Sequence, residues 1–226
     1  MSPSARWQGH QRRIGLTGGI ATGKSSIGRH LAALGLPVLD ADRFAHEALA
    51  PGSKGESAVL KRYGARVTAP CDGAIKELKS NSRINRKALG SIVFNAPDEL
   101  RWLEQLIHPY VRERFDEALV GLNDEPTVVL MIPLLFEANL TGLCSEVWVV
   151  HCQPQQQIER IQKRDGLDES AAKARIDAQW PIGQKQELAD QLIDNSGDAG
   201  RWEGQIQHLL DAPISLRTTH GQGNNH

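Results

Sequence analysis

The sequence predicts a doubly wound α/β fold, in which helices cover both faces of a parallel sheet. The segments that resemble strands are nearly continuous apolar runs, which is typical of strands buried on both faces. The segments between them carry apolar residues at helical spacing, and a glycine-rich turn follows the first run. Strands that alternate with helices form such a sheet, and 226 residues suffice for one well-buried core.

Five segments have the composition of buried strands. Four of them contain short runs of aliphatic residues, and the fifth has the weakest pattern. They cover residues 13–17, 36–40, 127–132, 146–150 and 190–194.

A helix is expected directly after the glycine-rich turn. Ile27, Leu31 and Leu34 fall on one face of such a helix. Gly35 stands where the helix would stop, because glycine commonly ends helices in a left-handed conformation.

Two further helical segments each begin with a proline, at 97–109 and 109–119. His108 precedes the second proline, so a hydrogen-bonding role at a helix end is the simplest interpretation of this histidine. The apolar residues that recur at helical spacing are Leu100, Leu103 and Leu106 in the first segment and Val111, Phe115 and Leu119 in the second.

Three regions lack these patterns. Residues 64–90 are polar and turn-rich, which predicts an irregular surface excursion. The termini, residues 1–12 and 211–226, are expected to be disordered, since the tail has little apolar content.

The overall charge excludes several classes of partner. Lys and Arg number 26 against 27 Asp and Glu, a net charge of -1 that argues against nucleic acid and anionic membranes. The longest apolar run, 127–136, is short for a membrane helix and contains Pro133. No secretion signal is evident at the N-terminus, so we expect a cytoplasmic protein that is a monomer or a weak homo-oligomer.

The glycine-rich turn matches the P-loop pattern Gly18-x-x-x-x-Gly23-Lys24-Ser25, between a strand and a helix as that pattern requires. Gly18, Gly19 and Gly23 let the backbone wrap around an anion, and the helix start adds its positive dipole end. Lys24 is expected to reach the β- and γ-phosphates, and Ser25 to offer a hydroxyl to Mg²⁺. The fold class is therefore of the P-loop NTPase type, and the spacing disfavours a turn without a ligand.

Two carboxylates, Asp40 and Asp42, end the second strand, where a doubly wound sheet opens its crevice. A carboxylate here can accept the proton of an acceptor hydroxyl or hold the water shell of a metal. Aspartates after a strand also cap helices, and Asp42 could cap the helix that follows. The sequence leaves open the alternative that one of the pair serves only as a cap.

A hinged helical hairpin is expected near residues 158–179. Arg160 and Arg164 share one helical face just before Gly166, and Arg175 follows on the next helix. Such guanidinium groups suit a lid that closes over a triphosphate. The alternative, a solvated helix with local Arg–Glu and Arg–Asp pairs, fits the spacing equally well.

The third strand lacks the Walker-B aspartate of an ordinary P-loop NTPase, since Ile132 and Pro133 occupy that position. The stretch 133–136 is interpreted as an apolar wall for an acceptor, with Glu137 as a polar anchor. A core-only role for Leu134 and Leu135 stays open.

These features together favour a small-molecule kinase. A regulatory GTPase needs a guanine-reading Asn-Lys-x-Asp segment, which residues 85–88 do not supply. A DNA-dependent ATPase needs a Walker-B acid, and a non-catalytic nucleotide binder needs no acceptor-side carboxylates. A kinase of a nucleoside or nucleotide, or a non-catalytic nucleotide-binding protein, remains the alternative.

The motifs "LTGGIATGKSS", "VLDADRFAHE", "LIHP", "PLLFE", "QQIERIQKRDGLDESAAKARIDAQ" and "ADQLIDNSG", in this order, resemble dephospho-CoA kinase. The resemblance covers about residues 13–210. It implies transfer of the ATP γ-phosphoryl group to the ribose 3′-hydroxyl of dephospho-CoA. It also implies a five-stranded core, an acceptor-binding helical subdomain at roughly 60–125 and a lid at roughly 158–180.

The resemblance implies a role for each matched residue. Asp42 would be the base that faces the 3′-hydroxyl, and Asp40 would support Asp42 or position Mg²⁺. The lid would include Arg160 and Arg164. ATP would be cradled by Gly18, Gly19, Ala21, Thr22, Gly23, Lys24, Ser25 and Ser26, with Asn195 near the adenine. The acceptor side would include Thr17, Asp40, His108, Pro133, Leu134 and Glu137.

The chain departs from the family pattern in two places. Ala21 and Thr22 stand where Gly-Ser is usual, at positions of the loop that vary. Residues 74–84 resemble an insertion in the acceptor subdomain.

Overall fold

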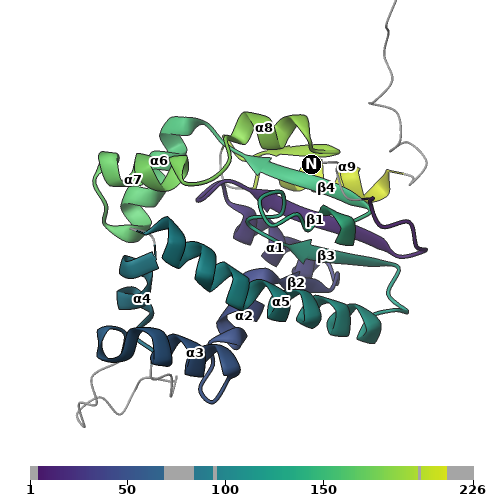
Figure 1. Ribbon diagram of the computed structural model, residues 1–226. Helices are drawn as coiled ribbons and strands as arrows, with labels where there is room; N and C mark the ends of the chain where they lie inside the picture. Colours follow the sequence, from purple (N-terminus) through teal and green to yellow (C-terminus); the bar gives the residue numbers. More distant parts are fainter. Residues whose placement is uncertain (1–4, 69–83, 94–95, 198–199, 213–226) are drawn as a thin grey trace, which may run out of the picture. The chain divides into compact units, whose positions relative to one another are not determined.

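The computed structural model describes residues 5–68, 84–93, 96–197 and 200–212. Five strands form one parallel sheet in the order β2-β3-β1-β4-β5 (Figure 1). All five predicted strands are confirmed. Their bounds are β1 Arg12–Gly18, β2 Val38–Asp40, β3 Thr127–Met131, β4 Glu146–His151 and β5 Gln191–Asp194.

Strand β1 lies at the centre of the sheet and pairs with both β3 and β4. Leu16 is in register with Met131 on one side and with Trp148 on the other. The chain builds β2 and β3 on one side of β1 and then β4 and β5 on the other. The carboxyl end of β1 is therefore the topological switch point, where such sheets bind ligands.

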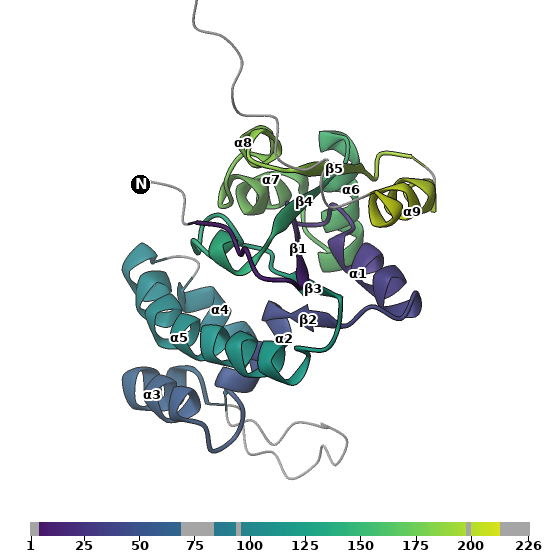
Figure 2. The same ribbon diagram turned by 90° about the vertical axis from the view of Figure 1, so that its right-hand side faces the viewer.

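Contacts divide the chain into two compact units, Met1–Leu39 with Leu122–His226 and Asp40–Gly121. In the first unit, α1 and α9 lie on the same face of the sheet (Figure 2). Ile27 and Leu31 of α1 and Ile206 of α9 are buried there against the strands. The helices of this unit are α1 Lys24–Ala33, α6 Pro154–Asp165, α7 Glu169–Asp177, α8 Ile182–Glu187 and α9 Glu203–Asp211, with a 3-10 turn at Thr141–Leu143.

The end of α1 corrects one expectation. Leu34 follows the last helical residue, and its side chain is 47% exposed, so it does not share the buried face of Ile27 and Leu31. Gly35 adopts φ 88 and its N–H donates to the carbonyl of Ala32, 3.0 Å away. The left-handed glycine reverses the chain one residue too early for Leu34 to continue the apolar face.

The second unit, Asp40–Gly121, is helical and has its own core. Phe44 of α2 meets Phe115 of α5 edge to face, with ring centroids 5.0 Å apart. The predicted acceptor region, roughly 60–125, overlaps this unit, and its role remains a prediction. The elements are α2 Ala41–Ala48, α3 Lys54–Tyr63, a 3-10 turn at Gly64–Arg66, α4 Arg86–Val93 and α5 Pro97–Gly121.

Helix α5 is continuous, so the prediction of two segments that meet at Pro109 was wrong. Pro109 lies inside α5, and His108 is an exposed residue in mid-helix rather than at a helix end. An internal proline costs about 3 kcal/mol. Buried apolar residues follow it, among them Phe115, and partly buried leucines precede it, so packing on both sides offsets that cost.

The expected irregular excursion at 64–90 is also corrected in part. Residues 86–90 belong to α4, and Ile84, Leu89 and Val93 are buried in the core of this unit. Residues 69–83, which hold most of the suspected insertion at 74–84, lie outside the described residues. The region is mostly polar, but its few apolar residues, Ile84, Leu89 and Val93, are spaced so that they pack into the core of the second unit.

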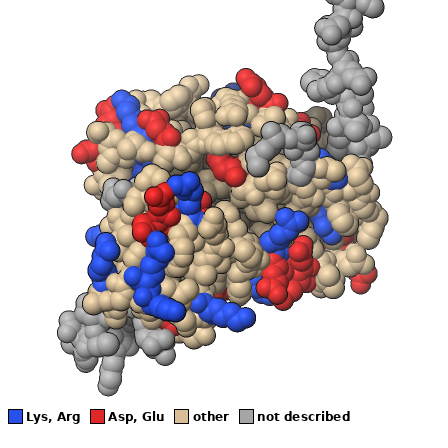
Figure 3. Space-filling model, viewed as in Figure 1, with Lys and Arg blue, Asp and Glu red and all other residues tan. Residues whose placement is uncertain are grey.

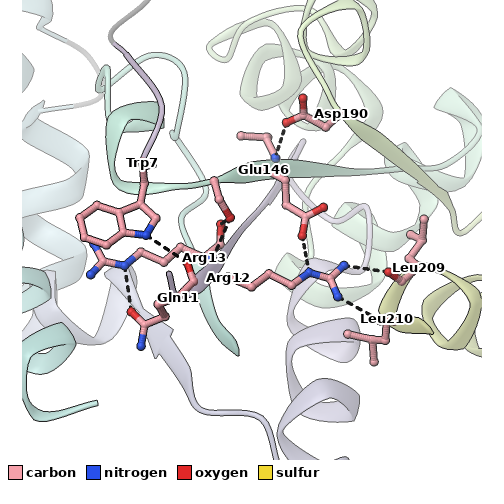
Figure 4. A network of polar contacts seen from close by, with 10 residues as sticks. Trp7, Gln11, Arg12, Arg13, Glu146, Asp190, Leu209 and Leu210 are labelled. Carbon is pink, nitrogen blue, oxygen red and sulfur yellow. Dashed lines mark hydrogen bonds and ion pairs between the residues drawn. The ribbon is translucent and has the colours of Figure 1, made fainter. Parts of the chain in front are cut away.

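Residues 5–12, expected to be disordered, are ordered by contacts with distant parts of the chain. Trp7 N–H donates to the Cys144 carbonyl at 3.0 Å, and Gln11 Nε2 donates to the Leu122 carbonyl at 2.6 Å. Figure 4 shows Trp7 and Gln11 in one polar network with Arg12 and Glu146. Residues 1–4 and 213–226 lie outside the described residues.

Charges of both signs lie beside one another on the face shown in Figure 3. Such interleaving agrees with the near-neutral total of 26 basic and 27 acidic residues. Among the helices of the described residues, none combines the length and the apolar character that a membrane span requires.

Candidate active site

The loop between β1 and α1 has the backbone geometry of a P-loop. Gly18 ends the strand with φ 154, and Gly23 precedes α1 with φ 99, a left-handed conformation. A Cβ on Gly18 would lie 2.4 Å from the Val150 carbonyl oxygen, and one on Gly23 would lie 2.0 Å from Asn195 Nδ2. Both positions therefore require glycine for space as well as for backbone freedom.

Hydrogen bonds hold the carbonyl groups of this loop. Thr22 Oγ1 donates to the Gly19 carbonyl at 2.9 Å, and Gln157 Nε2 donates to the Ile20 carbonyl at 2.6 Å. Asn195 Nδ2 donates to the Thr22 carbonyl at 2.8 Å. Because these carbonyls are fixed by the protein, the peptide planes of the loop are fixed too. Helix α1 begins directly after this fixed loop, so the positive end of its dipole lies where a P-loop binds an anion.

Lys24, Ser25 and Ser26 form the first turn of α1. Ser25 is exposed, whereas Ser26 Oγ accepts a hydrogen bond from Arg29 Nη2 at 3.2 Å. Ser25 is thus the better placed of the two hydroxyls for a metal ion. The described residues contain no group of three or more His, Cys, Asp or Glu side chains that could hold a metal by itself. A single hydroxyl beside phosphate suits Mg²⁺, which usually keeps water and phosphate oxygens as its other ligands.

Thr17 differs from its expected place on the acceptor side. Its side chain is fully buried, and Oγ1 donates to the Pro133 carbonyl at 3.1 Å. This bond joins the end of β1 to the loop after β3. Thr17 therefore supports the site from within the core, and its contact with the acceptor remains a prediction.

The predicted hairpin is present, with α6 and α7 side by side (Figure 1). Gly166 ends α6 in a left-handed conformation with φ 68. Arg160 turns toward the P-loop, where Nη2 donates to the Asn195 carbonyl at 3.0 Å and Nη1 to the Thr22 carbonyl at 3.5 Å. Arg160 therefore bonds to the P-loop, and its action in a lid over the triphosphate remains a prediction.

Arg164 behaves as the alternative interpretation described. It forms two hydrogen bonds of 2.8 Å with Asp165, and Arg175 reaches the same carboxylate at 2.6 Å. The guanidinium of Arg164, and then that of Arg175, lowers the pKa of Asp165. The structure brings Arg160 and the loop together but leaves Arg164 in a local surface ion pair.

Two glutamines at the loop were missed by sequence reasoning. Gln157 lies three residues before Arg160 and so on the same face of α6, a spacing that could have identified it. Gln179 follows α7, and its Oε1 accepts from the Ile20 N–H at 2.8 Å. Nothing in the sequence around Gln179 distinguishes it.

The segment after β3 is held within the first unit. Leu135 is fully buried and Phe136 stacks on Trp180, with centroids 6.4 Å apart, so the core-only reading holds for Leu135. Glu137 pairs at 2.6 Å with Lys185, a fully buried lysine that sequence reasoning missed. Glu137 is thus a polar anchor for the chain itself.

Comparison with known proteins decides which P-loop family this is. The model of the dephospho-CoA kinase family matches residues 12–200. The chain belongs to the dephospho-CoA kinase family. A relative from Synechococcus sp. (strain CC9605), named dephospho-CoA kinase, is 58% identical over 200 residues, which are 88% of this chain and 92% of the relative. One from Prochlorococcus marinus (strain MIT 9313), with the same name, is 54% identical over 92% of this chain and 99% of its own.

Two solved structures share the fold. A protein from Thermus thermophilus matches 89% of this chain and 97% of its own with TM-score 0.72 and 32% identity. The dephospho-CoA kinase from Campylobacter jejuni matches 88% of this chain and 94% of its own with TM-score 0.61 and 28% identity. The predicted P-loop fold with a five-stranded parallel sheet is therefore confirmed.

The two aspartates that resemble the family pattern, Asp40 and Asp42, differ in their local structure. Asp40, not Asp42, caps α2, because Asp40 Oδ1 accepts from the Asp42 N–H at 2.9 Å. Asp42 lies in the first turn of α2 with an exposed side chain. Of the two, Asp42 is the residue whose position leaves a chemical role open.

Proposed function

We propose that this chain transfers the γ-phosphoryl group of ATP to the ribose 3′-hydroxyl of dephospho-CoA, which yields coenzyme A and ADP. One observation carries the proposal: this chain of the dephospho-CoA kinase family has a P-loop in which side chains of the protein bond the carbonyls of Gly19, Ile20 and Thr22. Kinases of this class act by positioning and by neutralising charge, so a rigid, amide-lined loop is what they need.

On the nucleotide side, Lys24 would pair with the β- and γ-phosphates, and Arg160 would add a second positive charge beside the loop. Ser25 would offer its hydroxyl to Mg²⁺, which when bound neutralises charge on the phosphate oxygens. Asn195, which is buried and bonded to the loop, would border the adenine side. The backbone of residues 18–26 would cradle the phosphates.

On the acceptor side, Asp42 would be the general base. Its carboxylate would take the proton of the 3′-hydroxyl while that oxygen forms a bond to the γ-phosphorus, and the bond to the bridging oxygen of ADP breaks. Asp40 would hold the start of α2 by its cap. His108, Pro133, Leu134 and Glu137 would border the acceptor, Glu137 through its hold on neighbouring segments.

We also infer that the protein works in the cytoplasm as a monomer or a weak homo-oligomer, without nucleic-acid or membrane partners. The near-neutral charge supports this, with 26 basic and 27 acidic residues. Light scattering coupled to gel filtration measures the oligomeric state, and a stable tetramer would contradict the inference.

The function is tested by coupled ADP release with purified protein, Mg·ATP and a set of acceptors. We expect turnover with dephospho-CoA and little with nucleoside monophosphates or small sugars. Turnover with a nucleoside monophosphate alone would favour the alternative kinase. ATP binding without turnover on any acceptor would favour a non-catalytic binder.

The base is tested with Asp42→Asn, which should lower kcat about 10²–10⁴-fold with ATP affinity largely kept. Asp116→Asn is the matched control, since Asp116 is an exposed aspartate on α5 of the same unit. Normal turnover of Asp42→Asn would remove Asp42 from the mechanism and leave Asp40 as the next candidate.

A further inference from the structure

The hairpin α6–α7 is attached to one residue of the P-loop at both of its ends. Gln157, near the start of α6, donates from Nε2 to the Ile20 carbonyl at 2.6 Å. Gln179, two residues after α7, accepts at Oε1 from the Ile20 N–H at 2.8 Å. Both backbone polar groups of Ile20 are therefore bonded to the hairpin, from positions 22 residues apart in the chain.

Apolar packing reinforces these two bonds. Ile20 and Ala21 pack against a small core of the hairpin, made of Ile158, Ile161 and Ala172. A P-loop residue at this position could be any type, yet here the side chain enters the hairpin core. The loop and the lid thus share a hydrophobic cluster as well as hydrogen bonds.

The segment that carries Gln179 is itself fixed to the loop after β3. Glu137 Oε1 accepts from the Trp180 N–H at 3.2 Å and pairs with Lys185 Nζ at 2.6 Å. Trp180 also stacks on Phe136 with an interplanar angle of 6°. Lys185 is fully buried, so loss of Glu137 would leave a buried charge without its ion-pair partner. The peptide bond between Gln179 and Trp180 is thus held by the Glu137 carboxylate, directly beside the side chain that accepts from Ile20.

From this arrangement we propose that Gln179 is a positioning residue for phosphoryl transfer, which fixes the Ile20 peptide and so aims the phosphate-binding amides that follow it. The inference rests on the proposed function. Ala21, the next residue, adopts φ 57, which a non-glycine residue holds only when its neighbours fix it. Loss of the Gln179 acceptor frees the Ile20 N–H and lets the loop relax from that conformation.

Three variants test the proposal. Gln179→Met removes the acceptor at similar length, and Gln179→Glu keeps an oxygen acceptor. Gln184→Met, at an exposed position on α8, is the matched control. The readouts are kcat, KM for both substrates, ADP affinity by calorimetry and the melting temperature without ligand.

We expect Gln179→Met to lower kcat about 10–10²-fold and to weaken ADP binding, because small misplacements in a site have effects of this size. KM for dephospho-CoA and the melting temperature should stay near those of Gln184→Met. Gln179→Glu should lie closer to wild type than Gln179→Met, since a backbone N–H bonds well to a carboxylate. If Gln179→Met does not fold, Gln157→Met tests the other half of the same attachment.

Equal kcat in Gln179→Met and Gln184→Met would overturn the proposal, as would equal losses in the Met and Glu variants at position 179. The proposed function fails separately, when wild-type protein binds ADP but does not phosphorylate dephospho-CoA. In that case ADP affinity still decides the role of Gln179. A wild-type protein that binds no ADP would overturn both.

Discussion

The two ends of strand β1 are both polar and both buried, but they are built differently. At the first end, the guanidinium of Arg12 bonds to Glu146 at 2.5 Å and to the carbonyls of Leu210 and Leu209 at 3.0 and 2.7 Å (Figure 4). These carbonyls belong to the last turn of α9, where a positive charge is favourable. The chain pairs this cation with a carboxylate and two carbonyls of its own.

At the other end, after Gly18, side chains of the protein bond carbonyls of the loop, and Lys24 begins helix α1. The proposed function assigns this loop and Lys24 to the phosphates of ATP. Polar burial alone therefore does not identify a functional site. What distinguishes the site is that bonded carbonyls of a glycine-rich loop lead directly into the N-terminus of a helix, which is where proteins bind anions. The following predictions separate the two ends.

The largest effect on stability is expected from Arg12→Met. Both partners are buried, with side chains 7% and 2% exposed, so the variant removes the ion pair of a buried carboxylate. The free energy of unfolding should fall by about 3–5 kcal/mol. Urea unfolding measures the loss, and kcat of the folded protein should hardly change.

The double variant Arg12→Met with Glu146→Leu sharpens this prediction. It should lose less stability than Arg12→Met, because no buried charge is left behind. A large loss of kcat in folded Arg12→Met would contradict the purely structural role assigned to this end of β1.

Lys24→Met should affect activity and hardly affect stability, in contrast to Arg12→Met. We expect kcat to fall about 10²–10³-fold, as when a group that stabilises transition-state charge is removed, and nucleotide affinity to fall as well. The free energy of unfolding without nucleotide should change by less than about 1 kcal/mol. Lys163→Met, at an exposed position on α6, is the control. Unchanged ATP binding would contradict the assignment of the loop.

Gly23→Ala should lower stability by less than Arg12→Met does and nucleotide affinity by less than Lys24→Met does. A left-handed alanine costs about 1–2 kcal/mol, and its Cβ would displace Asn195 from the loop. We expect a lower melting temperature and weaker nucleotide binding together. Gly183→Ala in α8 is the matched control, where a Cβ meets nothing within 4 Å and should stabilise the helix slightly. Equal nucleotide affinity in the two variants would show that Asn195 is dispensable.

The smallest effect concerns an exposed ion pair in the second unit. Hydrogen bonds from Arg62, then from Tyr63, lower the pKa of Glu99 to about 2. A carboxylate with a lowered pKa stabilises the fold above its unfolded pKa, and that contribution is lost as the pH falls from about 4.5 toward 2. Melting temperatures between pH 5 and pH 3 should therefore fall more steeply in wild type than in Glu99→Gln. Parallel curves would show that this pair contributes nothing measurable.

Local patterns were sufficient for much of the fold. All five strands were identified because a continuous apolar run is visible in residues that are adjacent in the sequence. The P-loop and the helix end at Gly166 were identified for a similar reason, since a glycine at such a position indicates a backbone conformation that other residues rarely adopt.

The failures share a different origin. The sequence split α5 at Pro109, and only packing on both sides of this proline keeps the helix continuous. It assigned Leu34 to a buried face, and it named Asp42 as a possible cap of the helix that Asp40 caps. Each error concerns a choice between two local options that have similar energies, which the surrounding structure decides.

The sequence by itself determined the sheet, the phosphate loop and the family pattern, because these depend on residues that are close together in the chain. Only the tertiary structure decided what holds the loop. The bond from Ile20 to Gln179 joins residues 159 apart, and the one from Asn195 to Thr22 joins residues 173 apart. Glutamine and asparagine carry no periodic signal of their own, so their roles arise only when folding brings a distant peptide within hydrogen-bond distance.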